Sequence, residues 1–189
     1  MKTIASILAL AALLVGCAAP TVREPATAKA VFYPALPNAP RIQHLTTIAS
    51  DRDIGEPISG FARFIVGEDT GAQRLRQPYG VAAFDGRLYV ADSRAPGLAV
   101  FDLKERRYTL ITGAGNGRMK RPINVTIDQD GTKYVTDTGR DQVLVFDRAD
   151  RFVTAFGTEG QFKPVDTAIA GNRLYTVDIK NHQVQVLDK

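Results

Sequence analysis

Few residues in this chain have the types and spacing that catalysis requires. The sequence contains two histidines, His44 and His182, which lie far apart and outside HExxH or any comparable metal motif. Asp128 to Gly131 matches the start of a calcium loop, but the glutamate that completes such a loop is missing, and a hairpin turn explains the segment. Gly113 to Gly117 lacks the Lys-Ser/Thr pair of a phosphate loop, which favours a simple turn. No catalytic constellation is visible, and we expect a protein that is not an enzyme.

Three aspartates recur at a regular interval. Asp92, Asp137 and Asp178 are separated by 45 and 41 residues. A residue present in every structural repeat is usually architectural, because repeats are conserved in shape for packing on their neighbours. Each aspartate follows an apolar run and precedes a polar turn, where a carboxylate accepts hydrogen bonds from backbone N–H groups. We predict this structural role rather than a catalytic one.

The aspartates belong to three segments that align with one another. These segments run from Gln77 to Asp102, from Arg121 to Asp147 and from Lys163 to Asp188. A proline near the start of each segment recurs as well, at Pro78, Pro122 and Pro164, with spacings of 44 and 42 residues. Independent landmarks that repeat together indicate a repeated structural unit.

Each segment has the pattern of consecutive β-strands. In the first segment the apolar run Val81–Phe84 leads to Asp85-Gly86, a pair that supplies the positive φ of a tight hairpin. Further strands are expected at 88–90, 98–101 and 108–112, at 125–127, 133–135, 143–146 and 152–156, and at 174–176 and 184–187. Four strands in roughly 40 residues is the size of a β-propeller blade. We predict an all-β fold made of such blades.

The order Pro-x-Gly, apolar strand, Asp-Gly, Tyr-Val-x-Asp, polar turn and Val-x-Val-Phe-Asp resembles the NHL repeat. Asn181-His182 preserves part of the turn for which that repeat is named, whereas Arg94-Ala95-Pro96 departs from it. The resemblance covers Arg41 to Lys189 and is strong from Gln77 onward. It implies an NHL-type propeller of six blades, of which about three and a half are visible here. We expect a fragment of a longer protein, with a ring closed by two copies as the alternative.

Asn124 and Asp166 stand where the first segment has Gly80. By the resemblance, both lie at the start of the innermost strand, close to the central channel of a propeller. Oxygen side chains there suit a hard cation such as calcium, and propeller lactonases and the NHL-like peptide-amidating lyases place metals on that axis. Polar lining of a water-filled channel explains the same residues. We prefer the second interpretation and expect no cofactor, with calcium as the alternative.

The N-terminus predicts export. Met1-Lys2 precedes an uncharged apolar run, Ile4–Val15, that is shorter than the roughly 20 residues of a transmembrane helix and fits a signal peptide. The run ends in Leu14-Val15-Gly16-Cys17, which resembles a bacterial lipobox. Cys17 is the only cysteine of the chain, which excludes an internal disulfide. We expect residues 1–16 to be cleaved and Cys17 to carry the lipid, palmitate included, that anchors the protein to a membrane.

Residues 17–41 are rich in proline and alanine, which predicts an extended tether, with packing of Tyr33 to Pro40 on the folded body as the alternative for that portion. We expect the partial propeller over 42–189, with repeats at about 77–120, 121–162 and 163–189. Strands at 42–48 and 64–67, separated by an insertion with one helical turn, would belong to a further blade.

The net charge and the expected export limit the classes of partner that this protein can have. The formal net charge of +4 is a weak excess, and an exported protein rarely meets nucleic acid, so no nucleic-acid partner is expected. Ala18 after Cys17 differs from the aspartate that favours inner-membrane retention. In a Gram-negative cell this favours the outer membrane, facing the periplasm.

A propeller presents many loops on a rigid body, so recognition surfaces arise easily. We expect a non-catalytic scaffold that binds a protein or ligand in the cell envelope. The loops after the recurring aspartates, which contain Arg94, Arg140 and His182, are the candidate contact sites. One alternative is a metal-dependent enzyme of the lactonase or peptide-amidating lyase type. Another is a structural envelope protein that docks with an export or redox assembly and binds no small ligand.

Overall fold

The computed structural model describes residues 30–35, 37–39, 41–55 and 71–189. The residues up to Thr46 form one compact unit, and those from Thr47 to Lys189 form another. The expected signal peptide, Cys17 and the strand expected at 64–67 lie outside the described residues. No helix among the described residues has the length and apolar character needed to cross a membrane.

The first unit contains a small hairpin. Its strands β1 (Val31–Tyr33) and β2 (Ile42–His44) pair antiparallel, with Val31 opposite His44. Part of the segment expected to be a tether is therefore paired. The strand expected at 42–48 is only three residues long, and it pairs with this segment rather than with a blade. Its side chains are exposed, so no core extends it.

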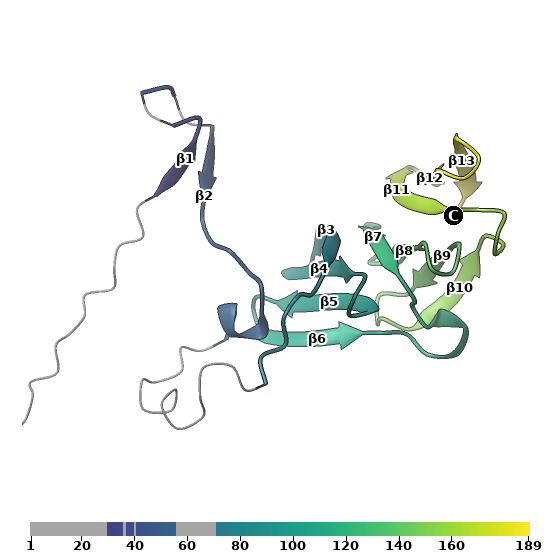
Figure 1. The fold of residues 1–189 in the computed structure, drawn as a ribbon, viewed down its shortest axis with the longest axis horizontal. Helices are drawn as coiled ribbons and strands as arrows, with labels where there is room; N and C mark the ends of the chain where they lie inside the picture. The colour runs from purple at the N-terminus through teal and green to yellow at the C-terminus, as the bar shows by residue number, and fades with distance from the viewer. Residues whose placement is uncertain (1–29, 36, 40, 56–70) are drawn as a thin grey trace, which may run out of the picture. The chain divides into compact units, whose positions relative to one another are not determined.

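The second unit is built from three antiparallel sheets that follow one another along the chain (Figure 1). Sheet 1 contains β3 (Pro78–Phe84), β4 (Arg87–Asp92), β5 (Gly97–Asp102) and β6 (Arg107–Ile111) in that order. Sheet 2 contains β7 (Pro122–Ile127), β8 (Lys133–Asp137), β9 (Gln142–Phe146) and β10 (Phe152–Phe156). Sheet 3 contains β11 (Pro164–Ala170), β12 (Arg173–Asp178) and β13 (Gln183–Asp188). The predicted all-β fold of propeller-type blades is confirmed.

The recurring proline sets a bulge at the start of each sheet. Pro78 lies opposite Asp92, and the register shifts before Val81 pairs with Val90. Proline has no N–H to donate to the ladder, so the pairing is interrupted at that point. The first strands of sheets 2 and 3 show the same shift after Pro122 and Pro164. The far end of β3 closes through Asp85 and Gly86, whose φ values of 50° and 76° fit the predicted hairpin turn.

The sheets pack face to face through apolar side chains. Sheets 1 and 2 share a core that includes Tyr89, Leu98, Val135, Leu144 and Phe146. Sheets 2 and 3 share a second core. Every residue of β8 is buried, whereas burial alternates along β12. Sheet 2 is therefore covered on both faces, and sheets 1 and 3 each bury apolar side chains against it.

Two short 3₁₀ turns lie among the described residues of the second unit. The turn η2 (Asp51–Asp53) fits the helical turn expected in the insertion, and Ile48, Ile54 and Leu75 pack there against the outer face of sheet 1. The turn η3 (Gly115–Gly117) lies in the glycine-rich segment between sheets 1 and 2. The interpretation of that segment as an inter-blade turn is therefore confirmed.

Candidate functional site

The first recurring aspartate joins two stretches of chain. Asp92 is fully buried, and its carboxylate accepts backbone N–H groups from Arg76 at 2.5 Å and Gln77 at 3.0 Å, just before β3. It also accepts the N–H groups of Arg94 and Ala95, both at 3.0 Å, in the turn after β4. One carboxylate thus fixes both the entry to the sheet and the turn that follows its second strand.

The next two aspartates repeat this arrangement. Asp137 is fully buried and accepts N–H groups at distances between 2.6 and 3.1 Å from Lys120, Arg121, Gly139 and Arg140. Asp178 accepts the N–H groups of Lys163, Lys180 and Asn181, together with the Asn181 side-chain amide at 2.6 Å. The predicted architectural role of the three aspartates is confirmed.

These hydrogen bonds also control ionisation. Burial by itself raises the pKa of Asp92, but the four backbone N–H groups outweigh it and hold the pKa below its ordinary value of 3.8. Burial likewise acts to raise the pKa of Asp178, while the Asn181 amide and the N–H groups of Lys163, Asn181 and Lys180 lower it. Both carboxylates therefore stay charged at neutral pH.

The loops that follow these aspartates share one edge of the three sheets, here called the Asp92 edge. The opposite edge, which carries the hairpin turns after β3, β7 and β11, is called the Asp85 edge. Arg94, Arg140 and His182 all lie on the Asp92 edge, in successive sheets rather than in one site. The Arg140 guanidinium donates to Gln142 Oε1 at 3.0 Å and to the Arg118 carbonyl at 2.9 Å, so this candidate contact residue also fixes the local chain. His182 is exposed and has a φ of 54°, as a turn residue does.

The first strands of the three sheets contact one another at Gly80, Asn124 and Asp166. A Cβ atom added to Gly80 would lie 2.7 Å from the Cα of Asn124, so only glycine allows β3 and β7 to approach. Asn124 in turn donates through Nδ2 to Asp166 Oδ1 on β11. The two side chains singled out as lining a channel mouth therefore contact each other.

The pair is arranged for hydrogen bonding rather than for metal coordination. Asp166 Oδ1 also accepts the backbone N–H of Thr167 at 2.8 Å, and Asn124 presents its NH₂ group to the carboxylate. A cation would need the Asn124 amide turned over, so that its carbonyl oxygen faced the ion. Within the described parts of the chain, no group of three or more His, Cys, Asp or Glu side chains is placed to hold a metal ion.

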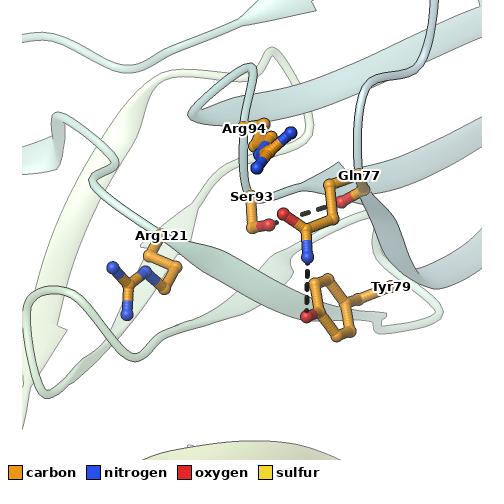
Figure 2. Close-up of a pocket in the computed structure, with 5 residues that line it drawn as sticks. All are labelled: Gln77, Tyr79, Ser93, Arg94 and Arg121. Atoms are coloured by element: carbon orange, nitrogen blue, oxygen red, sulfur yellow. Dashed lines mark hydrogen bonds between the residues drawn. The ribbon is translucent and has the colours of Figure 1, made fainter.

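A hollow of about 370 Å³ opens on the Asp92 edge where sheet 1 meets sheet 2. Its lining residues are Gln77, Tyr79, Ser93, Arg94 and Arg121 (Figure 2). Gln77 Nε2 donates to the Tyr79 hydroxyl oxygen at 3.1 Å, and the Ser93 hydroxyl donates to the Gln77 carbonyl at 3.4 Å. Sequence reasoning singled out Arg94 alone among these five. Two signals were available: the departure of Arg94-Ala95-Pro96 from the repeat, and the basic run Arg118–Arg121, for which the sequence favours a solvated loop.

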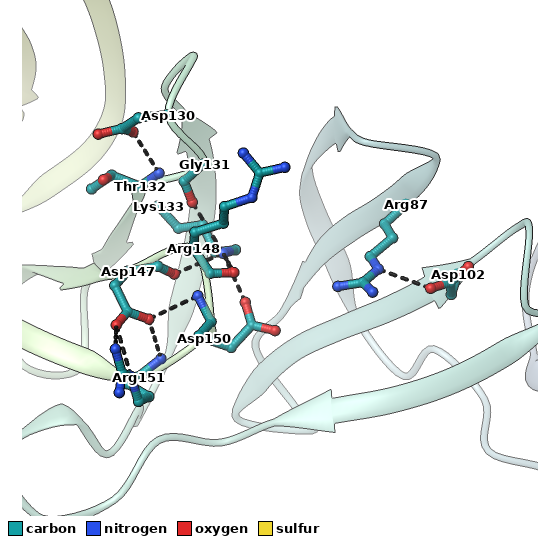
Figure 3. Close-up of polar contacts among 11 residues, drawn as sticks. Arg87, Asp102, Asp130, Gly131, Thr132, Lys133, Asp147, Arg148, Asp150 and Arg151 are labelled. Atoms are coloured by element: carbon teal, nitrogen blue, oxygen red, sulfur yellow. Dashed lines mark hydrogen bonds and ion pairs between the residues drawn. The ribbon is translucent and has the colours of Figure 1, made fainter.

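A buried lysine, also missed from the sequence, links the turns of sheet 2 on the Asp85 edge (Figure 3). Lys133 is 1% exposed, and its Nζ donates to the carbonyls of Gly131, Asp147 and Arg148 at 3.1, 2.9 and 3.3 Å. The same Nζ lies 2.8 Å from Asp150 Oδ1. It also lies 5.3 Å from the centre of the Tyr89 ring in sheet 1. The partners of the Lys133 ammonium group are all protein groups, and the side chain is buried, so we assign this network a structural role.

No family model matches the chain, and no curated protein matches its sequence. Among solved structures the chain is similar to virginiamycin B lyase from Staphylococcus aureus, at 13% identity and a TM-score of 0.43 over 66% of this chain and 43% of that one. It is similar to a streptogramin B lyase at 13% identity and 0.43, over 59% and 40%. A catalytically inactive virginiamycin B lyase from Staphylococcus aureus with quinupristin gives 14% and 0.43, over 60% and 41%. The chain thus spans less than half the length of these proteins.

Proposed function

We propose that this chain is a lipid-anchored envelope protein whose propeller-type blades act as a non-catalytic scaffold for binding a protein or ligand. The observation that carries this proposal is the use made of the three recurring aspartates. Each carboxylate accepts backbone N–H groups from a loop of the Asp92 edge. The recurring acidic groups therefore fix the conformation of the loops that form this surface. Recognition is commonly placed on loops that a rigid body positions.

The anchor and the family rest on the sequence. The apolar run before Cys17 supports export and lipidation, and the NHL-like motifs support a propeller of the kind found in bacterial lipoproteins. In a Gram-negative host we place the protein on the outer membrane, facing the periplasm, with a protein partner in the envelope. Several acyl chains on one cysteine would hold the protein stably, whereas a single chain binds weakly.

The lipid anchor is tested by growing the native host with a labelled palmitate. Wild-type protein should take up the label and sediment with membranes, and Cys17→Ser should lose both properties. An unlabelled wild-type protein, or a labelled Cys17→Ser variant, would contradict the anchor.

The scaffold is tested with photo-crosslinking residues placed in the full-length protein in its host. Pro96 and Lys180, both exposed on the Asp92 edge, are the test positions. Lys104 and Gln129, exposed on the Asp85 edge of sheets 1 and 2, are the matched controls. We expect one defined envelope protein to be crosslinked from the Asp92 edge and not from the Asp85 edge. The same adducts from both edges, or none from either, would refute the proposal that this edge is the recognition surface.

The Asn124–Asp166 pair is expected to line a wet channel without holding a metal, because each side chain already serves as a partner of the other. Calorimetry with calcium chloride should detect no saturable heat for wild type or for Asp166→Ala. Calcium binding by the wild type that Asp166→Ala abolishes would instead favour a metal-dependent propeller enzyme.

A further inference from the structure

The hollow between sheets 1 and 2 is not part of the common repeat. The bulges place Gln77, Arg121 and Lys163 at equivalent positions, just before the proline of each first strand. At the junction of sheets 2 and 3, the residues equivalent to Tyr79, Ser93 and Arg94 are accordingly Ile123, Thr138 and Gly139. The first junction thus carries a phenol that the next junction lacks, and two arginines where the next has Arg121 and Lys163. Side chains that depart from a repeat on a shared scaffold are not required by the fold.

The charged side chains that line the hollow are both positive. Arg94 and Arg121 are both exposed, and across the described residues neither guanidinium takes part in a hydrogen bond or ion pair. No acidic side chain lines the hollow. The carboxylates that accept the backbone N–H groups of Arg94 and Arg121 belong to Asp92 and Asp137, which are buried and surrounded by further N–H groups. Two guanidinium forks without carboxylate partners are suited to an oxyanion, to which each can donate two hydrogen bonds.

The remaining lining groups suit a small organic molecule. Gln77 donates to the Tyr79 oxygen, which orients the phenol and leaves its O–H free to donate to a ligand. Tyr79 is 58% exposed, and its ring offers an apolar surface on another wall of the same hollow (Figure 2). A volume of about 370 Å³ is in the range of small-molecule sites and too small for a folded partner.

From these features we infer that the hollow lined by Gln77, Tyr79, Ser93, Arg94 and Arg121 binds a small organic anion through its carboxylate or phosphate group. The Arg94 and Arg121 side chains lie apart in Figure 2, so on binding they turn toward the oxyanion, while Tyr79 contacts the organic part of the molecule. The inference rests on the proposed binding function and names the class of ligand that one part of the Asp92 edge would take.

Calorimetric titration of the full-length protein with inorganic phosphate and with benzoate tests this at fixed ionic strength. Benzamide, which has the same ring without a charge, is the neutral control. The Arg94→Ala/Arg121→Ala double variant should lower the affinity for both anions at least tenfold. The Lys180→Ala/Lys163→Ala double variant removes the same charge from equivalent positions of sheet 3 and should stay within twofold of wild type. Preference for phosphate over benzoate, or the reverse, identifies which oxyanion the site takes.

A further double variant separates the effect of the positive charge from that of the planar guanidinium geometry. Arg94→Lys/Arg121→Lys keeps the charge but loses the planar fork, and we expect intermediate affinity with unchanged melting temperature. Equal weakening by both alanine double variants would show a diffuse charge effect and overturn the inference, as would the absence of saturable binding by either anion. If wild-type protein binds neither anion while the Pro96 and Lys180 crosslinks persist, the anion site is refuted and the scaffold proposal stands.

Discussion

Buried and exposed charges have different roles in this chain. The carboxylates of Asp92, Asp137 and Asp178 each accept at least three backbone N–H groups, whereas the Arg148–Asp85 ion pair joins side chains that are 63% and 68% exposed. Exposed pairs of that kind contribute little, while hydrogen bonds to a buried carboxylate are worth about 1.5–3 kcal/mol. Stability at the residue scale therefore rests on the aspartates.

Replacing Asp92 by asparagine should lower the free energy of unfolding by about 2–3 kcal/mol at pH 7. The asparagine amide has one acceptor oxygen, and its NH₂ group would face backbone N–H donors. Urea unfolding followed by circular dichroism measures the difference. Asp85→Asn, in the exposed ion pair, is the matched control and should change the free energy by less than about 0.5 kcal/mol.

The same variant tests the pKa of Asp92. Because the folded-state pKa lies below the ordinary value of 3.8, the stabilisation is complete above that value and is lost as the pH falls toward the folded-state pKa. The gap in unfolding free energy between wild type and Asp92→Asn should therefore narrow as the pH falls from 5 to about 2.5. A gap that stays constant over this range would mean that the Asp92 pKa is not lowered.

Lys133 stands where the other two sheets have Leu88 and Leu174, yet leucine is not expected to replace it well. Lys133→Met should cost about 2–4 kcal/mol, because three carbonyls and the Asp150 carboxylate would lose their shared donor. Thermal unfolding measures the loss, with Leu88→Met as an apolar control costing less than about 1.5 kcal/mol. Lys133→Met/Asp150→Asn should recover part of the loss, and a fully stable Lys133→Met would contradict the network.

At the scale of elements, packing between sheets depends on the size of the side chains on the first strand of each sheet. Gly80→Ala should destabilise the protein by about 1–3 kcal/mol, because the new Cβ would lie 2.7 Å from the Asn124 backbone and force β3 away from β7. Gly86→Ala is not a suitable control, since its φ of 76° is strained for alanine. Ala82→Gly, on the same strand, serves as the control for strand propensity. A stable Gly80→Ala would show that the two strands can separate without cost.

Most strands could be predicted from the sequence, and the hollow could not. Pairs such as Asp85-Gly86 fix turns locally, so alternating apolar residues on either side define strands without knowledge of the rest of the chain. The hollow forms only when Arg121 of sheet 2 is brought against residues of sheet 1, and no local pattern encodes that approach. For the same reason the sequence did not show that Arg140, a candidate contact residue, donates to the Arg118 carbonyl directly after the η3 turn.

At the scale of the whole molecule, stability should be graded along the three sheets of the second unit. Sheet 2 contributes to both inter-sheet cores, and sheet 1 is further covered by Ile48, Ile54 and Leu75. Sheet 3 contributes to one core, and Val184 and Val186 of β13 are 58% and 50% exposed. In stacked repeats each unit is stabilised by its neighbours, so the unit with fewer covered faces opens first.

Native-state hydrogen exchange should therefore rank the sheets. Amides of β8 and β9 should exchange slowest, because global unfolding alone exposes them, and those of β12 should exchange at least tenfold faster through local opening of sheet 3. The comparison is well matched, since β8 and β12 both lie between two hydrogen-bonded strands and differ in side-chain burial. Amides of β4 should follow β8. Equal protection of β8 and β12 would mean that the three sheets unfold as one cooperative unit, in which case Lys133 and Asp92 variants should destabilise sheet 3 as much as their own sheets.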